Sequence, residues 1–126
     1  MIVLDASALL TYLFRESNHK IVEKYIEDAC ISTVILSEVA RRFIRDGIDA
    51  TPIIQHLNKT SIEIVPFTQA HALHAANFIP LTQRYGLSLG DRACLGLAAA
   101  RNLPAQTADI AWPEIEGIDV KNIQIR

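Results

Sequence analysis

Short runs suited to strands, separated by longer segments with helical character, constrain the fold of this chain more than any other sequence feature. The runs fall at residues 2–4, 29–32, 62–65, 104–108 and 120–125. The first reads Ile-Val-Leu, which is typical of a strand buried in a parallel sheet. The last alternates apolar and polar residues, the pattern of an edge strand. Strands that alternate with helices predict an α/β layer fold around a mainly parallel sheet.

The segments between these runs carry the capping residues and the apolar spacing of helices. Gly47 is placed to end one helix, and Pro80 interrupts another that Thr68 caps. Ser17 is placed to cap a helix with an apolar face, which carries Ile21, Val22, Tyr25 and Ile26. We predict the remaining helices over residues 6–14, 34–45, 50–57, 68–78 and 89–101, the last packed on both sides.

Size and composition are those of one folded domain over residues 1–126, half of it hydrophobic. The net charge of −2 provides no overall basic field, which argues against a simple nucleic-acid-binding module. Cys30 and Cys94 lack partners at zinc-ligand spacing and are expected as reduced core residues. The apolar run at residues 1–4 is too short for a signal peptide, and no run approaches the roughly 20 apolar residues of a membrane span. We expect a cytoplasmic protein that does not enter a membrane.

Four acidic residues stand out because each follows a predicted strand or lies near the start of a helix: Asp5, Glu38, Asp91 and Asp109. The carboxyl ends of parallel strands share one rim, so the predicted topology gathers these side chains there. Two carboxylates about 4 Å apart repel by roughly 4 kcal/mol at an effective dielectric constant near 20. Bound Mg²⁺ or Mn²⁺ removes this cost, because hard oxygen ligands are their natural partners. We therefore predict an acidic pocket that binds a divalent cation.

Each acid also has an ordinary structural interpretation. Asp5 is placed to cap the helix that follows it, and Glu38 is one turn from Arg42. Asp91 forms a capping-box variant with Ser88, and Asp109 is placed to make an Asx-turn. The prediction of a site therefore depends on the four positions together.

Four segments of the sequence resemble PIN-domain ribonucleases and, more narrowly, the VapC toxins of bacterial type II toxin–antitoxin pairs. They are Val-Leu-Asp-Ala-Ser-Ala-Leu-Leu from residue 3, Ser-Glu-Val from 37, Gly-Leu-Ser-Leu-Gly-Asp-Arg-Ala-Cys-Leu from 86, and Thr-Ala-Asp-Ile-Ala-Trp from 107. The resemblance spans nearly the whole chain. It implies a three-layer α/β/α fold and a Mg²⁺- or Mn²⁺-dependent endoribonuclease that leaves 5′-phosphate and 3′-hydroxyl ends.

The resemblance also implies roles for individual residues. Asp5 and Asp91 match metal ligands, with Asp109 close by, and Glu38 matches an acid that acts through water. Two hydroxyl residues, Ser7 and Thr107, match positions that order the pocket. Ile110 departs from the family, because many relatives carry a charged residue there, often Arg.

The same resemblance implies partners, namely an RNA substrate, a cognate VapB-like antitoxin and a second copy of the chain in a homodimer. A candidate groove for the antitoxin is the apolar face of Leu9, Leu13, Tyr25 and Ile26, which is equally consistent with core packing. Arg92 is the favoured RNA contact beside Asp91, and Arg84 lies near it in sequence. Arg42 is a further candidate for phosphates, whereas Arg41 and Arg45 are interpreted as a solvated face with internal ion pairs. His71 and His74 are expected at the surface or rim.

Other classes fit less well. Haloacid-dehalogenase-like phosphatases need a second Asp two positions after the first, where Ser7 stands, and receiver domains need paired acids after the first strand and a late Lys. The alternative that remains is a catalytically silent PIN-like module that binds RNA or protein.

Overall fold

A five-stranded sheet in the order β3-β2-β1-β4-β5 forms the centre of the protein in a computed structural model that describes residues 1–125. All four strand pairings are parallel. The strands are β1 (Ile2–Leu4), β2 (Ala29–Ser32), β3 (Glu63–Val65), β4 (Ala105–Thr107) and β5 (Asn122–Gln124). The predicted parallel sheet and the edge position of the last strand are therefore confirmed.

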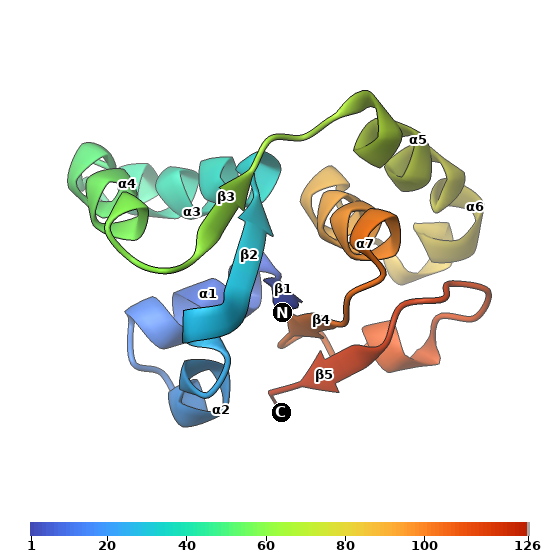
Figure 1. Ribbon diagram of the computed structural model, residues 1–126, viewed down its shortest axis with the longest axis horizontal. Helices are drawn as coiled ribbons and strands as arrows, with labels where there is room; N and C mark the ends of the chain where they lie inside the picture. The colour runs from blue at the N-terminus through green and yellow to red at the C-terminus, as the bar shows by residue number, and fades with distance from the viewer. Residues whose placement is uncertain (126) are drawn as a thin grey trace.

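Helices lie on both sides of this sheet and make the three layers. Figure 1 shows α1 and α2 on one side, α5, α6 and α7 on the other, and α3 and α4 beside the β2–β3 end. The helices are α1 (Ala6–Leu13), α2 (His19–Glu23), α3 (Thr33–Arg45), α4 (Thr51–Asn58), α5 (Gln69–Asn77), α6 (Ile79–Thr82) and α7 (Leu89–Arg101). Short 3-10 turns are η1 (Ile26–Asp28), η2 (Gln83–Tyr85) and η3 (Trp112–Glu114).

Helix α7 is the most deeply buried helix, as its Ala- and Leu-rich sequence predicts. Its residues 93–98 are buried without interruption, and a Cβ on Gly96 would come within 3.0 Å of the His71 carbonyl oxygen of α5. The absence of a side chain at Gly96 therefore allows α5 to approach α7 closely. Cys30 and Cys94 are buried free thiols, as predicted.

Helix α2 is shorter than predicted. Ser17 does not cap it, because Asn18 precedes the first turn with a left-handed φ of 71° and makes no side-chain cap. Asn tolerates this conformation better than most residues. The helix ends at Glu23, so Tyr25 and Ile26 lie beyond it, partly buried against the core.

One expectation about surfaces is wrong, and an alternative that the sequence left open is decided for Leu9. His71 is only 6% exposed. It belongs to the capping box of α5, in which Thr68 N donates to His71 Nδ1 at 3.4 Å and His71 N donates to Thr68 Oγ1 at 3.3 Å. Leu9 is fully buried, so it cannot line an open groove, and Leu13 packs partly buried against the same core. Within residues 1–125, no helix is both long and apolar enough to cross a membrane.

Candidate active site

The four predicted acids lie at the carboxyl-end rim of the sheet, and we call them the carboxylate cluster. Asp5 follows β1 directly, Asp109 lies two residues after β4, and Glu38 and Asp91 lie in the first turns of α3 and α7. Their charges act on one another: the charge of Asp91 raises the pKa of both Asp5 and Glu38, and the charge of Asp109 raises the pKa of Asp91. Asp91 is therefore the centre of the cluster.

Asp5 is held by two hydroxyl groups and is almost completely buried, at 3% exposure. Ser7 Oγ and Thr107 Oγ1 each donate to Asp5 Oδ2 at 2.9 Å. The other oxygen, Oδ1, is buried without a hydrogen-bond partner. Asp5 stands at the N-cap of α1 but makes no side-chain cap, so the capping interpretation is wrong. Burial, and then the charge of Asp91, raise the pKa of Asp5 to about 7.

Hydrogen bonds through Ser7 and Thr107 also connect Asp5 to the segment that follows strand β4. Ser7 Oγ accepts from Ala108 N at 3.0 Å, and Thr107 Oγ1 accepts from Asp109 N at 3.0 Å. The two hydroxyl oxygens are 3.2 Å apart. These bonds fix the orientation of the Asp5 carboxylate and leave Oδ1 as its free oxygen.

Asp91 has the capping role that the sequence allowed as an alternative. Ser88 N donates to Asp91 Oδ2 at 2.9 Å, and Asp91 N donates to Ser88 Oγ at 3.2 Å. Burial is nevertheless the largest influence and raises the pKa of Asp91 above its ordinary value, although the bonds to Ser88 oppose it. The cap uses Oδ2, which leaves Asp91 Oδ1 for other contacts.

Glu38 does not pair with Arg42, which instead binds Asp46, with 3.3 Å between Nε and Oδ2. Burial and then the charge of Asp91 raise the pKa of Glu38, while Arg41 lowers it. A Cβ on Gly90 would collide with the Glu38 carboxylate. The Glu38 carboxylate therefore lies against the first turn of α7, beside Asp91, and Gly90 makes this approach possible.

Asp109 makes the Asx-turn that was its ordinary interpretation, because Ala111 N donates to its Oδ1 at 2.9 Å. Its carbonyl oxygen also accepts from Gln124 Nε2 of β5 at 3.1 Å. The neighbouring Ile110 is 74% exposed. Asp109 is thus fixed at the rim with one carboxylate oxygen engaged in the turn.

The chemistry of this cluster fits a divalent cation, although its geometry is not that of a closed ligand set. Across residues 1–125, no three His, Cys, Asp or Glu side chains are placed to hold one metal ion. Two of the four acids have an oxygen committed to backbone N–H groups. A divalent cation would nevertheless provide a partner for the free buried oxygen of Asp5 and would offset the like charges around Asp91. Asp5 and Asp91 are the residues best suited to hold it.

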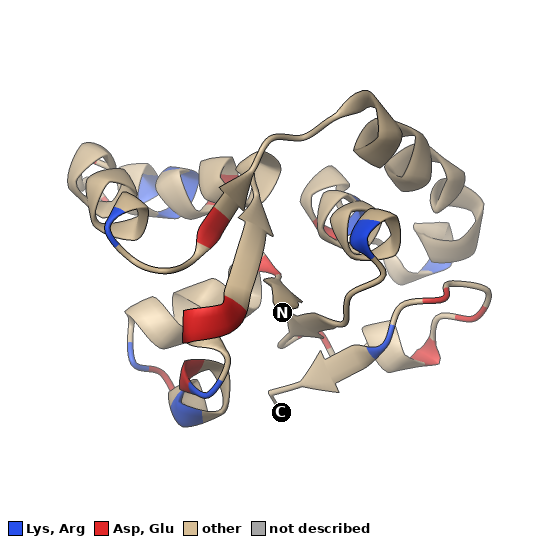
Figure 2. Cartoon of the chain, viewed as in Figure 1, with Lys and Arg blue, Asp and Glu red and all other residues tan. Residues whose placement is uncertain are grey.

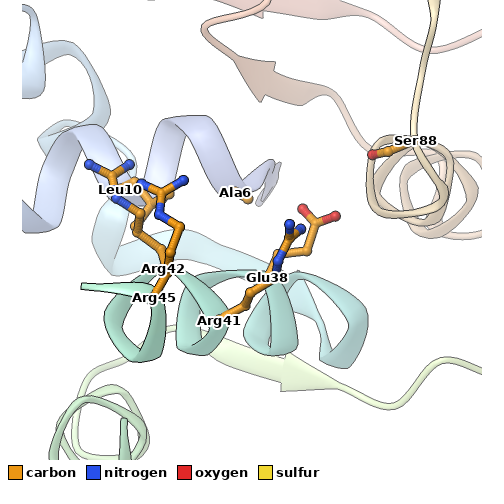
Figure 3. Close-up of a pocket in the computed structure, with 7 residues that line it drawn as sticks. All are labelled: Ala6, Leu10, Glu38, Arg41, Arg42, Arg45 and Ser88. Carbon is orange, nitrogen blue, oxygen red and sulfur yellow. The ribbon is translucent and has the colours of Figure 1, made fainter. Parts of the chain in front are cut away.

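Beside the cluster lies an open hollow of about 310 Å³ between α1, α3 and the start of α7. Figure 3 shows three arginines rising from α3 on its α1 side, and the Glu38 carboxylate extending toward α7. The hollow is lined by Ala6, Leu10, Glu38, Arg41, Arg42, Arg45 and Ser88.

The arginines that line this hollow differ from the one favoured by the sequence. Arg92 Nη1 donates to the Ala75 carbonyl oxygen of α5 at 3.2 Å, which directs that side chain toward α5. A sequence signal for the arginines of α3 was available in their spacing. Positions i, i+3, i+4 and i+7 share a helix face, and these are residues 38, 41, 42 and 45. The role of Gly90 had no comparable signal, since it depends on the position of Glu38 in the fold.

Fold and site together define an α/β protein with a carboxylate cluster at the carboxyl ends of a parallel sheet. The sequence profile of the PIN domain matches residues 2–118 of the chain. The chain therefore belongs to the PIN-domain family, as its motifs indicated. No curated protein sequence matches it at a significant level.

Solved structures of toxins and toxin–antitoxin complexes share this fold over nearly their whole length. A toxin–antitoxin complex from Klebsiella pneumoniae has a TM-score of 0.73 at 18% identity, covering 100% of this chain and 98% of that one. DNA-bound VapBC from Salmonella typhimurium has a TM-score of 0.72 at 16% identity, covering 99% and 98%. VapC20 from Mycobacterium tuberculosis is described as a sarcin-ricin loop cleaving toxin. It has a TM-score of 0.72 at 12% identity, covering 96% of this chain and 99% of that one. At such identities the likeness establishes the shared fold alone.

Proposed function

We propose that this protein is a Mg²⁺- or Mn²⁺-dependent endoribonuclease and the toxin of a type II toxin–antitoxin pair. The observation that carries the proposal is the state of Asp5. Its carboxylate is buried, does not cap its helix, and keeps one oxygen without a partner beside the charge of Asp91. A bound cation would give this oxygen a partner and would offset the repulsion between Asp5 and Asp91, which supports a metal-binding role for this acid.

The residues of the cluster take different parts in the hydrolysis of a phosphodiester. Asp5 and Asp91 would hold the cation, with Asp109 as a third ligand, and Ser7 and Thr107 keep Asp5 oriented. When bound, the cation supplies Lewis-acid activation of water and of the phosphate. Glu38, whose pKa is raised by burial, accepts the proton of the attacking water. The water oxygen bonds to phosphorus as the bond to the 3′ oxygen breaks. The 3′ oxygen takes a proton from solvent, which leaves 5′-phosphate and 3′-hydroxyl ends.

The partners follow from the same resemblance. The neighbours from Klebsiella pneumoniae and Salmonella typhimurium are described as toxin–antitoxin assemblies, the second bound to DNA. We propose a VapB-like antitoxin for this chain, a homodimeric toxin, and action on RNA in the cytoplasm.

Cleavage of total RNA by the purified protein tests the enzymatic part of the proposal. We expect discrete fragments with Mn²⁺ or Mg²⁺ and none with EDTA. Asp5→Asn, purified in the same way, controls for contaminating ribonuclease and should be inactive. Cleavage by Asp5→Asn at the wild-type rate, or equal cleavage in EDTA, would show that the cluster is not the active site.

A catalytically silent RNA- or protein-binding module is the second candidate. It is favoured by the ordinary bonds of Asp91 and Asp109 and by the lack of a ready ligand set within residues 1–125. Under this alternative the wild type cuts no RNA at saturating Mn²⁺. Arrest of growth on expression of the chain alone, relieved by co-expressing the product of an adjacent small gene, would support the toxin instead.

A further inference from the structure

We propose that Arg41, Arg42 and Arg45 of α3, together called the arginine face, bind phosphates of the single-stranded RNA segment next to the bond that is cut. This proposal rests on the proposed function, because it names the path of the substrate beyond the carboxylate cluster. Figure 2 shows Lys and Arg positions grouped along α3. All three guanidinium groups line the hollow that begins at Glu38.

The spacing along α3 aligns the arginine face with the carboxylate cluster. Residues 38, 41, 42 and 45 lie on one side of the helix and extend roughly 10 Å along its axis, at 1.5 Å per residue. Glu38 belongs to both the cluster and the hollow, and Ser88 of the hollow caps the helix that carries Asp91. A strand with one phosphate at the cluster therefore has its next nucleotides beside the arginines.

The arginines keep unused hydrogen-bonding capacity. Arg42 and Arg45 share a single carboxylate, that of Asp46, and both use Nε, at 3.3 Å and 3.6 Å. Their terminal amino groups are not used in these contacts. Among residues 1–125, Arg41 forms no ion pair, and its charge acts on Glu38. Three guanidinium groups thus lie near two carboxylates, those of Glu38 and Asp46. The arginine face therefore keeps a positive charge in a chain whose net charge is −2.

Aromatic packing holds one of these side chains in place. The Arg42 Cζ lies 5.2 Å from the centroid of the Phe14 ring, which stacks on Phe43 at 5.3 Å. An arginine fixed in this way loses less conformational entropy when it binds a phosphate. Ala6 and Leu10 add an apolar lining from α1, which suits the sugar and base of a nucleotide.

An acidic peptide from a protein partner would also suit arginines, but RNA accounts for more of the geometry. With a cation at the cluster, as the proposed function requires, a phosphodiester strand would place one phosphate at the cation and its next phosphates at the arginines. Repeated phosphates also match repeated guanidinium groups along one helix face.

The test measures binding of a short, fluorescein-labelled single-stranded RNA of mixed sequence, in EDTA to prevent cleavage, over a range of salt concentrations. The variants are the single Arg→Gln changes at 41, 42 and 45 and the triple change. Arg84→Gln is the matched control, because its Cζ also lies 5.2 Å from an aromatic centroid, that of Tyr85, but in a different hollow. A triple Arg→Lys variant keeps the positive charge and serves as the control for misfolding caused by substitution at these positions.

We expect the triple Gln variant to bind at least about tenfold more weakly, since each charged hydrogen bond to phosphate contributes on the order of that factor. The slope of log Kd against log salt should fall by about 2, from three contacts at roughly 0.7 each. The Lys variant should keep the slope, and Arg84→Gln should bind like the wild type. Equal binding and slope in the Gln variant and the wild type would overturn the proposal. Polyglutamate, measured in the same way, represents an acidic peptide. If the triple Gln variant loses polyglutamate binding but keeps RNA binding, the proposal is overturned in favour of a protein partner.

Cleavage kinetics in Mn²⁺ separate this proposal from the proposed function. If the wild type cuts RNA, the triple Gln variant should show a raised KM with little change in kcat. Wild-type KM in that variant would refute the arginine face while leaving the nuclease intact. If the wild type cuts nothing, the nuclease fails, and the binding measurement alone still decides whether the arginines contact RNA.

Discussion

The carboxylate cluster and the arginine face meet at Glu38 on α3, but the fold holds their charges in opposite ways. Asp5 is almost fully buried and keeps an unpartnered oxygen, whereas Arg41 and Arg45 are exposed. Burying a lone charge costs free energy, whereas water solvates a charge that is exposed. Asp5 is therefore expected to be stabilised by a bound cation, whereas Arg41 and Arg45 remain solvated without one.

The two regions also differ in their attachment to the sheet. Asp5 is bonded to β4 through Thr107 and to its own helix through Ser7. The arginines lie on a single helix, where Arg42 and Arg45 pair with Asp46 at the surface. Substitution of Asp5 should therefore change both chemistry and stability, whereas substitutions in the arginine face should change binding alone.

The largest effect is expected from Asp91→Asn, which removes the charge but keeps an oxygen that can accept from Ser88 N. Cleavage of RNA should fall at least about a hundredfold, the scale of losing a group that acts in the transition state. The free energy of unfolding should change little. Ser88→Ala is the complement: it removes a cap worth about 1 kcal/mol and should retain cleavage. If Asp91→Asn keeps its activity and Ser88→Ala loses it, Asp91 is only a cap.

A smaller loss is expected from Gly90→Ala, because its Cβ would displace the Glu38 carboxylate. Activity should fall roughly tenfold or more, while Ala in place of Gly within a helix favours stability by up to about 1 kcal/mol. Gly96→Ala on the same helix is the matched control. Its Cβ meets the His71 carbonyl at 3.0 Å, so it should lower the thermal midpoint with the activity of the folded protein unchanged. Full activity in Gly90→Ala would show that Glu38 has no fixed role there.

Stability of the cation-free protein should depend on pH through Asp5. Its pKa in the folded state is about 7, above its ordinary value of 3.8, so the folded state binds the proton more tightly. The contribution of Asp5 to the free energy of unfolding is full below about pH 4 and is lost as the pH rises through 7. Thermal unfolding in EDTA should give a midpoint several degrees lower at pH 8 than at pH 5, since about 1 kcal/mol shifts it by several degrees.

Asp5→Asn should flatten this pH dependence and unfold at a higher temperature than the wild type at pH 8. Added Mn²⁺ should restore the midpoint of the wild type at pH 8 and leave that of the variant unchanged, because only the wild type keeps the ligand. A wild type whose stability is equal at the two pH values would contradict the burial argument for Asp5.

The smallest effect is expected in the arginine face, from Asp46→Asn. Its ion pairs with Arg42 and Arg45 are at the surface, so stability should change by less than about 1 kcal/mol. Binding of single-stranded RNA should tighten by about twofold, since two guanidinium groups lose a competitor. Weaker RNA binding in this variant would show that Asp46 holds the arginines in place rather than competing for them.

The sequence predicted the strands and the rim positions of the acids because both depend on local signals. Residues 2–4 are apolar throughout and Asp5 follows them, so the topology of a parallel sheet places this acid at the rim. Helix α7 begins and ends as its caps indicated, at Leu89 and Arg101. The ordinary interpretations of Asp91 and Asp109 also proved true, and they coexist with the positions of these acids in the cluster.

What the sequence did not show depends on contacts between distant segments. The Ala75 carbonyl directs Arg92 toward α5, and the sequence around Asp91 does not indicate this contact between helices. The contact between Gly90 and Glu38 joins two helices, so neither segment alone indicates it. Ser17 was a reasonable cap, but the chain turns through Asn18 in a left-handed conformation instead.

A crystal soaked in Mn²⁺ tests most directly whether Asp5 and Asp91 hold a divalent cation. We expect an anomalous-difference peak beside the free oxygen of Asp5 and Asp91, and no such peak in Asp5→Asn crystals. A map without a peak at these carboxylates, at saturating Mn²⁺ and neutral pH, would contradict this expectation.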